Sequence, residues 1–326
     1  MSRNESGRLI LVTGGAGFIG SHLVEDLLDR GDRVRILDNF STGKRENLEA
    51  LGGDRSSAGT DFQLLEGDIR DYKTVLQAVS GTDAILHQAA LGSVPRSVED
   101  PMTTQTVNAD GTLNVFLAAK ECGIRRVVYA SSSAVYGDST RMPRKEGEEG
   151  LPLSPYALTK QVNEEYARLF RELYGLEAIG LRYFNVYGPR QDPHSQYAAV
   201  IPSFVSALLS GRPPVIFGTG EQSRDFTFAK DVVEANLLAL EASPDACGKA
   251  FNVGMGGEYD LLELLDKLQY LLGTSVDPRH DPMRPGDVMR SRADMSLARE
   301  MLGFEATYDL GKGLAESVAW YRENLG

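Results

Sequence analysis

Short apolar runs alternate with helical patterns through the first half of the chain. Runs that are apolar throughout are typical of strands buried on both faces of a sheet, whereas apolar residues three and four apart are typical of amphipathic helices. This pattern predicts strands at residues 9–12, 33–37, 62–65, 84–87, 126–130 and 179–183. It predicts helices at residues 21–29, 72–79, 101–120 and 156–174. Such alternation predicts an α/β fold with a doubly wound parallel sheet and right-handed crossovers.

The pattern changes after about residue 188, where Pro and Gly become more frequent. Short strands are predicted at residues 215–217 and 226–228, and a helix at residues 231–241. We therefore expect two domains, residues 1–187 and a smaller α/β lobe at residues 188–326 that closes over a crevice of the first. The boundary is soft, because the helix at 231–241 is also compatible with packing on the first domain. A charged segment at residues 141–150, which contains Pro143, predicts a solvent-exposed loop.

Composition and charge exclude several classes of protein. Of the 326 residues, 25% are charged and 42% are apolar, which is typical of a soluble globular protein. The net charge is −12 with no basic block, which argues against a nucleic-acid partner. No signal peptide is recognised, and no apolar run approaches the ~20 residues that span a bilayer, so we expect a cytoplasmic protein without a membrane partner. Cys122 and Cys247 are too few for a disulfide framework or metal cluster, so no metal is expected and each should be a small buried residue.

A glycine-rich turn joins the first predicted strand to the first predicted helix. Its glycines are Gly14, Gly17 and Gly20, spaced for a tight turn, a close approach of phosphate to the backbone, and close helix–strand packing. Such a turn alone also occurs without a nucleotide. The second predicted strand, however, ends in Asp38, 18 residues after Gly20. A carboxylate there accepts hydrogen bonds from a ribose and repels a 2′-phosphate, so the sequence predicts a Rossmann-like domain that binds NAD rather than NADP.

Small and polar residues follow four of the predicted strands: Asp38, Asp68, Ala90 and Ser132. Ligands of doubly wound sheets bind beyond the carboxyl ends of the strands. We therefore expect these residues to meet at one crevice.

Tyr156 and Lys160 lie one helical turn apart at the start of a predicted long helix. An ammonium beside a phenol favours the phenolate and lowers the phenol pKa, which makes Tyr156 a candidate general base. Hydroxyls of Ser131, Ser132 and Ser133, at the end of the preceding strand, are candidate donors to a substrate oxygen. A Tyr–Lys pair arises by chance on many helices, and serine clusters often only form loops. In this chain order, with a dinucleotide turn, they predict a hydride-transfer site.

These motifs resemble those of the extended short-chain dehydrogenase/reductase family over nearly the whole chain. The glycine turn, the segment Ser-Ser-Ser-Ala-Val-Tyr-Gly at residues 131–137, and Tyr156-x-x-x-Lys160 carry the resemblance. Within the family the chain most resembles UDP-hexose 4-epimerases, particularly those that act on UDP-N-acetylglucosamine (UDP-GlcNAc). The resemblance implies Ser132 as the catalytic hydroxyl, with Ser133 assisting it, and Tyr156 and Lys160 as base and partner. It also implies that bound NAD is retained between turnovers.

The resemblance assigns residues 1–187 to NAD and residues 188–326 mainly to the UDP-sugar. The implied NAD-binding residues are Gly14, Gly17, Phe18, Ile19, Gly20, Asp38, Asn39, Ser41, Gly43, Asp68, Ile69, Gln88, Ala89, Ala90, Asn108, Tyr156, Lys160 and Tyr183. The implied UDP-sugar-binding residues are Ser93, Arg96, Ser132, Asn185, Ala199, Val200, Val215, Phe217, Arg224, Arg284, Asp287 and Ser291. Arg224 and Arg284 are expected at the diphosphate, and Ser93 and Arg96 in a loop that contacts the sugar. A homodimer is also implied, through the helices predicted at 101–120 and 156–174.

Ser291 distinguishes between substrates by size. Epimerases restricted to unacetylated hexoses resemble one another in a tyrosine here, so a serine predicts room for a 2-N-acetyl group, with UDP-Glc and UDP-Gal as further substrates. Dehydratases of the family carry an Asp-Glu pair where this chain has Ser133 and Ala134, so elimination is disfavoured. UDP-glucuronate 4-epimerases and decarboxylases stay open, although decarboxylases typically place a carboxylate at the position of Ala134. A non-catalytic NAD-binding regulator is the remaining alternative.

Overall fold

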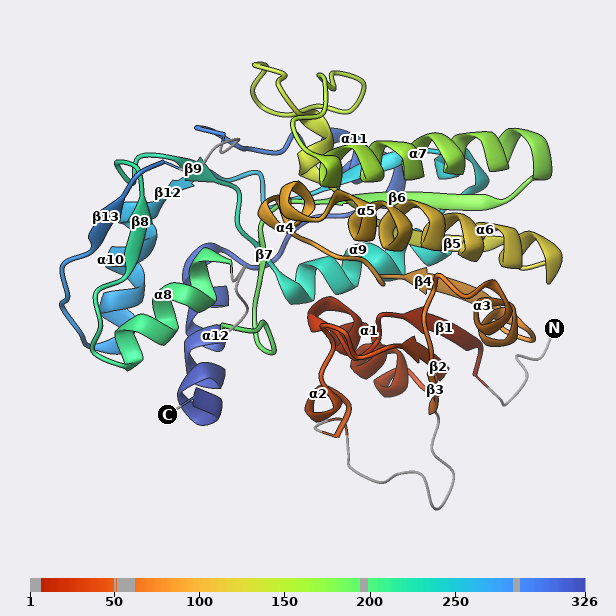
Figure 1. Ribbon diagram of the computed structural model, residues 1–326, viewed down its shortest axis with the longest axis horizontal. Helices are drawn as coiled ribbons and strands as arrows, with labels where there is room; N and C mark the ends of the chain where they lie inside the picture. The colour runs from red at the N-terminus through yellow and green to blue at the C-terminus, as the bar shows by residue number, and fades with distance from the viewer. Residues whose placement is uncertain (1–6, 50, 52–61, 194–198, 284–287, 326) are drawn as a thin grey trace.

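The apolar runs of the first half become neighbouring strands of one parallel sheet. The computed structural model describes residues 7–49, 51, 62–193, 199–283 and 288–325. Among these residues the sheet has seven strands in the order β11-β6-β5-β4-β1-β2-β3 (Figure 1). They are β1 (Leu9–Thr13), β2 (Arg33–Asp38), β3 (Phe62–Glu66), β4 (Ala84–His87), β5 (Arg126–Ser132), β6 (Glu177–Tyr183) and β11 (Ala250–Val253). The predicted doubly wound parallel sheet is confirmed.

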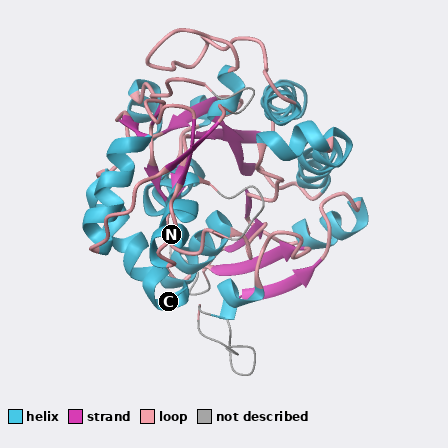
Figure 2. Cartoon of the chain, turned by 60° about the vertical axis from the view of Figure 1, so that its left-hand side comes forward, coloured by secondary structure: helices cyan, strands magenta, loops and turns pink. Residues whose placement is uncertain are grey.

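Helices cover both faces of the sheet (Figures 1 and 2). Successive side chains of a strand point to opposite faces. Ile10 and Val12 therefore join one core cluster with α1 (Phe18–Asp29), α9 (Ala229–Glu241) and α11 (Ser296–Leu302), whereas Leu11 joins a second cluster. That second cluster includes side chains of α3 (Tyr72–Val79), α6 (Gly111–Glu121) and α7 (Pro155–Tyr174). Burial on both faces explains why these strands are apolar throughout rather than alternating.

The register of the strands sets where each one ends. Thr13 pairs with Leu37 on one side and with His87 on the other. His87 pairs with Tyr129, and Tyr129 pairs with Gly180. This row of paired residues crosses β2, β1, β4, β5 and β6, so the segments after it leave the same edge of the sheet.

The predicted helix at residues 101–120 is divided. It consists of α5 (Pro101–Gln105), a π-helical turn (Thr106–Asp110) and α6. A π-helical turn contains one extra residue and rotates the side chains that come after it. Here Asn108 is fully buried within the turn, and its carbonyl accepts a hydrogen bond from the Thr112 hydroxyl at 2.6 Å.

The second half of the chain builds a lobe of its own and also returns to the sheet. The lobe has an apolar cluster built from side chains of α8 (Val200–Leu209), α10 (Leu261–Leu272) and α12 (Leu310–Leu325). Its short strands are β7 (Val186–Tyr187), β8 (Val215–Phe217), β9 (Ser223–Arg224), β10 (Thr227–Phe228), β12 (Tyr259–Asp260) and β13 (Arg279–Asp281). In contrast, β11 pairs with β6, and α9 packs against α1, β5 and β6. The division at residues 187 and 188 stays a prediction.

The charged segment at residues 141–150 is a loop, as the sequence predicts, and it is anchored at one buried residue. Four of its residues are exposed and five are half-exposed, whereas Arg144 is buried. The Arg144 backbone pairs with Arg292 and Asp294 through hydrogen bonds of 2.7 and 2.8 Å, and its guanidinium lies over the Tyr136 ring, 6.0 Å from the centroid. This anchor depends on a partner more than a hundred residues away, which no local pattern indicates.

The two cysteines form no disulfide with each other. Cys122 is half-buried and Cys247 is buried, and both thiols are free. Within the described ranges no group of three or more His, Cys, Asp or Glu residues is placed to hold a metal ion. No helix of the described residues has the length and apolar character to cross a bilayer.

Phe116 ties the sheet to the two helices that cover it. Its ring, fully buried on α6, lies 5.5 Å from the Tyr129 ring of β5 and 5.6 Å from the Phe170 ring of α7. We expect Phe116→Ala to lower the free energy of unfolding by about 3–5 kcal/mol, because the cavity cannot close between three rigid elements. Urea unfolding measures this. Tyr270→Ala, at an 87% exposed position, should change it by less than about 0.5 kcal/mol. A loss below about 1 kcal/mol for Phe116→Ala would contradict this role.

Candidate active site

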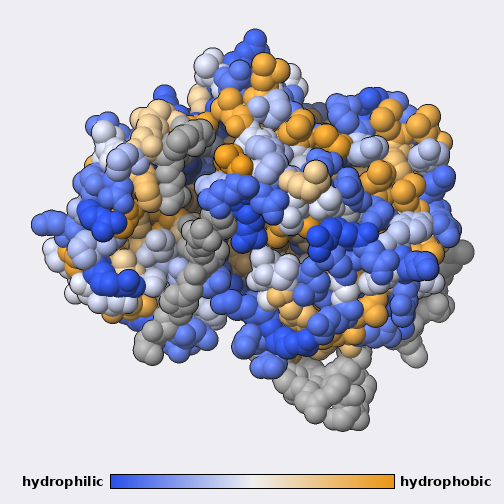
Figure 3. All heavy atoms as spheres, viewed as in Figure 1, coloured by the Kyte–Doolittle hydropathy of each residue, from blue (hydrophilic) through white to orange (hydrophobic). Residues whose placement is uncertain are grey.

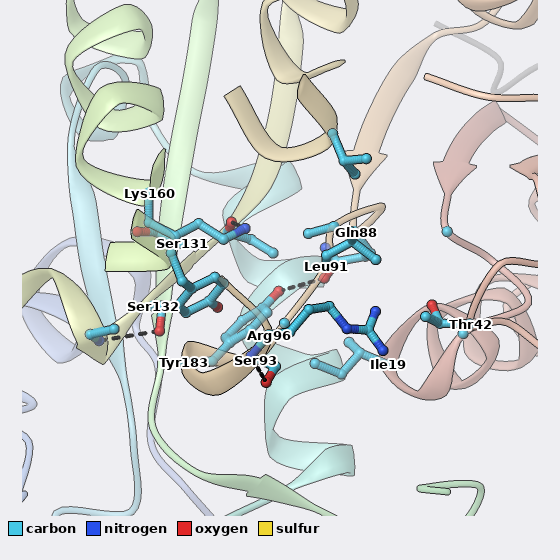
Figure 4. A pocket seen from close by; sticks show the side chains of 18 of the residues that line it. Ile19, Thr42, Gln88, Leu91, Ser93, Arg96, Ser131, Ser132, Lys160 and Tyr183 are labelled. Carbon is cyan, nitrogen blue, oxygen red and sulfur yellow. Dashed lines mark hydrogen bonds between the residues drawn. The ribbon is translucent and has the colours of Figure 1, made fainter. Parts of the chain in front are cut away.

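The carboxyl ends of β1, β2, β4, β5 and β6 open into one cleft of about 940 Å³ (Figure 4). The predicted site residues that line it are Gly14, Gly17, Phe18, Ile19, Gly20, Asp38, Asn39, Ser41, Asp68, Ile69, Gln88, Ala89, Ala90, Ser93, Arg96, Ser132, Ser133, Tyr156, Lys160, Tyr183, Asn185, Ala199, Arg224 and Ser291. Five described residues of the prediction lie outside its lining, namely Gly43, Asn108, Val200, Val215 and Phe217. Arg284 and Asp287 lie outside the described residues.

The turn between β1 and α1 approaches other backbone so closely that side chains would not fit. A Cβ on Gly14 would lie 2.7 Å from the Ala89 nitrogen, and a Cβ on Gly20 would lie 2.0 Å from the Gly14 oxygen. Gly14 also has a φ of +69°, which favours glycine. Gly17 precedes α1 and offers no capping side chain, so the first N–H groups of the helix are left for a ligand. Backbone donors at a helix N-terminus suit a diphosphate.

Asp38 is held at the end of β2 by backbone donors. Its Oδ2 accepts a hydrogen bond from Ala16 N at 2.9 Å and its Oδ1 one from Phe40 N at 2.8 Å. Burial raises the pKa of Asp38, and these two hydrogen bonds oppose the rise. Gly43 does not line the cleft; a Cβ there would lie 3.0 Å from Asp38 Oδ1, so the glycine lets the following loop close on the carboxylate. Each oxygen of Asp38 keeps a lone pair for a ribose hydroxyl.

Asp68 is fixed as a carboxylate on the next strand end. The Arg70 guanidinium, 2.7 Å from Oδ2, lowers the pKa of Asp68 to about 2, and the Asn39 amide donates to the same oxygen at 2.8 Å. Asp68 is therefore an ionised acceptor at neutral pH.

Asn108 is not among the lining residues of the cleft, and its predicted contact with the cofactor stays a prediction. Its Oδ1 accepts from Leu91 N at 2.8 Å and its Nδ2 donates to Leu91 O at 3.1 Å. The π-helical turn aims this amide at the backbone after β4. Asn108 thus holds the cleft wall that Ala89 and Ala90 form.

Tyr183 and Gln88 are joined to the second half of the chain. The Tyr183 hydroxyl donates to Gln88 Oε1 at 3.0 Å (Figure 4) and accepts from Asn236 of α9 at 2.9 Å. Burial raises the pKa of Tyr183 above its ordinary value, so the ring stays neutral.

Tyr156 is half-buried at the start of α7, beside the end of β5. Desolvation raises its pKa, and the neighbouring Ser132 hydroxyl opposes the rise. Ser132 also accepts a hydrogen bond from Ala134 N at 3.2 Å, which orients its hydroxyl. The sequence predicts that the neighbouring lysine lowers this pKa, whereas the net direction is upward because desolvation disfavours the phenolate.

Lys160 lies one turn further on α7, and its ammonium is directed at the sheet. Its Nζ donates to Ala130 O at 2.8 Å and lies 5.8 Å from the centroid of the Tyr156 ring. Burial lowers the pKa of Lys160 to about 8, so most of its charge is present at neutral pH. The fixed cation lowers the cost of forming the buried phenolate.

The residues predicted for the UDP-sugar only partly reach the cleft. Arg224 and Ser291 line it, and Ser291 N donates to Ser223 O at 3.2 Å. Val215 and Phe217 lie on β8 on either side of Ile216, which is fully buried in the cluster of the second lobe. Their side chains therefore point away from that cluster.

Ser93 ends the loop that follows β4, and Arg96 lies on the short helix after that loop; their predicted contact with the sugar stays a prediction. The helix is α4 (Val94–Glu99); Ser93 precedes it and accepts a hydrogen bond from Arg96 N at 3.2 Å, and Pro95 suits its first turn. In Figure 4 the Arg96 side chain extends toward Ile19 and Thr42, on the side of the glycine turn.

Sequence reasoning missed several lining residues, among them Thr42, Arg70, Arg144 and Gln191. Arg70 could have been found, because it comes two residues after Asp68 at a strand end. Arg144 could not, since its burial depends on residues 292–294.

The cleft fits the dinucleotide that the sequence predicts. The turn at Gly14 and Gly20 leaves space that a Cβ would fill, and the uncapped start of α1 supplies donors for a diphosphate. Asp38 supplies acceptors for a ribose, and Lys160 and Tyr156 lie further along the same cleft.

Comparisons with known proteins agree with this geometry. The model of a family described as "NAD dependent epimerase/dehydratase family" matches residues 10–254. The UDP-glucose 4-epimerase of Mycolicibacterium smegmatis is 42% identical over 96% of this chain and 98% of its own.

Solved structures give the same result. The UDP-N-acetylglucosamine 4-epimerase from Methanobrevibacter ruminantium, in complex with UDP-N-acetylmuramic acid, is 40% identical with a TM-score of 0.91, covering 98% of this chain and 99% of that one. The UDP-glucose 4-epimerase of Thermotoga maritima with UDP-glucose is 36% identical with a TM-score of 0.91, covering 98% and 100%.

These matches confirm the predicted resemblance, the predicted cofactor NAD and the prediction of an enzyme of the epimerase type. With a family model that spans most of its length and relatives alike from end to end, the chain belongs to the NAD dependent epimerase/dehydratase family.

Proposed function

We propose that the chain is a UDP-hexose 4-epimerase that interconverts UDP-GlcNAc and UDP-GalNAc, with UDP-Glc and UDP-Gal as further substrates. The observation that carries the proposal is the placement of Ser132, Tyr156 and Lys160 in the same cleft as the glycine turn. The relatives named as 4-epimerases of UDP-sugars support it.

The mechanism rests on this arrangement. Ser132 and Tyr156 both line the cleft, and the Ser132 hydroxyl is close enough to influence the pKa of Tyr156, so a sugar oxygen O4′ beside them is within reach of both hydroxyls. Tyr156 takes the proton from O4′, and Lys160 stabilises the phenolate beforehand. NAD, when bound, supplies the acceptor that takes hydride from C4′ and returns it. Tyr156 then gives its proton back to O4′, so the reaction has no net redox change.

Inversion requires the sugar to present both faces to the same residues. Arg224 is proposed to hold the diphosphate through its guanidinium. The hexose then turns about its bond to the diphosphate while the uridine end stays fixed. Gly14, Gly17 and Gly20 are proposed to bind the NAD diphosphate and Asp38 its adenosine ribose.

The competing reactions, dehydration and decarboxylation, need carboxylates at positions where this cleft has none. Ser133 and Ala134 both line the cleft where a dehydratase would carry its acid and base. Ala134 also occupies the position of the carboxylate typical of decarboxylases. A UDP-glucuronate 4-epimerase has the same Ser–Tyr–Lys core and differs from the proposed enzyme in its substrate. Cytoplasmic location stays a prediction.

A homodimer is proposed through the helices beside the active site. Leu158, Leu169 and Leu173 are exposed on α7, and Met102 is exposed on the neighbouring α5. Figure 3 shows apolar atoms gathered over the region of α6 and α7 labelled in Figure 1. An apolar stripe of this kind suits a helical interface between two copies.

The first test is direct. Purified protein incubated with UDP-GlcNAc should form UDP-GalNAc, detected by chromatography or NMR, and conversion of UDP-glucuronate alone would overturn the proposed substrate.

Tyr156→Phe should lower kcat by about 10²–10⁴-fold, because the general base is lost. Tyr174→Phe, on the exposed end of the same helix, should leave kcat unchanged. Near-full activity of Tyr156→Phe would refute the mechanism.

Ser291 gives a prediction about substrate size. Ser291 is 7% exposed and lines the cleft, so a tyrosine there would occupy space inside it. Ser291→Tyr should lower kcat/KM for UDP-GlcNAc by at least about tenfold, while UDP-Glc is affected much less. Equal losses on both substrates would count against the steric role.

A charged substitution on the apolar stripe tests the proposed dimer. Leu173→Glu places a carboxylate on the exposed apolar stripe and should give a monomer by light scattering coupled to gel filtration. Leu262→Glu, at an exposed site on α10, should leave the dimer intact. The proposal fails if the unaltered protein is a monomer, or if Leu173→Glu stays dimeric.

A further inference from the structure

A charged cluster centred on a buried arginine joins β5, β6 and α7, and the proposed mechanism does not use it. At its centre is Arg182 of β6, whose side chain is 6% exposed. Its Nε donates to Glu164 Oε1 at 2.9 Å and its Nη2 to Glu164 Oε2 at 2.7 Å. A bidentate pair of this kind fixes the plane of both groups. Arg182 Nη1 contacts Glu149 and donates to the Tyr136 hydroxyl at 3.0 Å.

Glu164 connects this cluster to the strand that carries the catalytic hydroxyl. The Ser131 hydroxyl donates to Glu164 Oε1 at 2.5 Å. Ser131 points away from the Ser132 side of the strand, as neighbours on a strand do. The contact therefore ties the end of β5 to α7 next to Ser132 in the cleft lining.

Glu164 is also one helical turn beyond Lys160 on α7. Residues four apart share a helix face, so the carboxylate and the ammonium interact electrostatically. Glu164 supports the charged form of Lys160 and opposes the effect of burial on its pKa. One carboxylate thus acts on two members of the proposed catalytic set.

We propose that Glu164 is a positioning residue of the active site: paired with Arg182, it fixes the end of β5 through Ser131 and keeps Lys160 in its ammonium form. This inference rests on the proposed function, because Glu164 acts through Tyr156 and Ser132, which the proposed function makes catalytic.

The other groups around Lys160 do not supply the negative charge that favours its ammonium form. On its own helix Lys160 faces Tyr156 and Glu164. From β4 it faces His87, which burial and the lysine charge keep neutral by lowering its pKa to about 3. Arg182 of β6 is paired with Glu164 at 2.7 Å. Among these groups, Glu164 carries the negative charge.

Glu164→Gln removes the negative charge of this side chain and keeps its size. The amide oxygen can still accept from Ser131 and Arg182 Nε, whereas the amide NH2 takes the place of Oε2 and loses the hydrogen bond from Arg182 Nη2. The negative charge that opposes the effect of burial on Lys160 is gone. Lys160 should therefore lose its proton at lower pH than in the unaltered enzyme, where its pKa is about 8. The alkaline limb of the kcat profile should move down by about one pH unit, which is about a fivefold loss relative to the unaltered enzyme at pH 8 and little loss at pH 6.

Glu149→Gln is the matched control. It removes the other carboxylate that contacts Arg182, so it perturbs the same charged cluster. Its effect on unfolding should be similar to that of Glu164→Gln, but the alkaline limb should stay in place. Ser131→Ala removes the contact to β5 while the charge of Glu164 remains. It should lower kcat several-fold without moving the limb.

A substrate-free readout separates this inference from the proposed function. The ¹³Cε resonance of Lys160, assigned with Lys160→Arg in lysine-labelled protein, reports its ionisation directly. A lower titration midpoint in Glu164→Gln supports the inference even if no UDP-sugar is converted. An unmoved midpoint in a folded Glu164→Gln protein overturns it, as does an equal shift in Glu149→Gln.

Discussion

Parallel pairing of β1, β4, β5 and β6 is the constraint on which the site depends. Because Thr13, His87, Tyr129 and Gly180 lie in one row, the chain leaves all four strands at the same edge of the sheet, β1 and β4 at the row itself and β5 and β6 three residues beyond it. At that edge the four strands lead, in turn, to the glycine turn, a wall of small residues, a serine hydroxyl and Tyr183. Backbone hydrogen bonds, rather than contacts among the functional side chains, thus bring these groups together. The side chains need only the right identity at the right strand end.

Much of the fold could be predicted because its signals are local. Apolar runs indicated the strands, and the glycine spacing and Asp38 indicated the dinucleotide turn. Tyr156 and Lys160 could be paired because four residues on a helix define a geometry. Local rules did not reveal the π-helical turn around Asn108, since it depends on an amide that pairs with the backbone at Leu91. Nor did they reveal that Arg144 is buried, because its backbone pairs with residues 292 and 294.

The electrostatics of Tyr156 show why a sequence motif predicts the position of a side chain better than it predicts the pKa of that side chain. Helical spacing correctly places an ammonium near the phenol, but the balance of pKa shifts depends on how completely water is excluded. In the structure desolvation dominates for both groups, raising the pKa of Tyr156 and lowering that of Lys160. The chain as a whole carries a net charge of −12, which disfavours anionic ligands. Arg96 and Arg224 both line the cleft and bring positive charge into it.

The path of the chain after residue 188 has a consequence for protein engineering. Strand β11 and helices α9 and α11 leave the second lobe and complete the layers of the first. A chimaera made by joining the amino-terminal half of one relative to the carboxyl-terminal half of another would therefore carry a foreign edge strand and two foreign helices into its nucleotide-binding layers. Specificity could be transplanted with less disturbance by exchanging the lobe in separate segments, leaving those three elements with their own sheet.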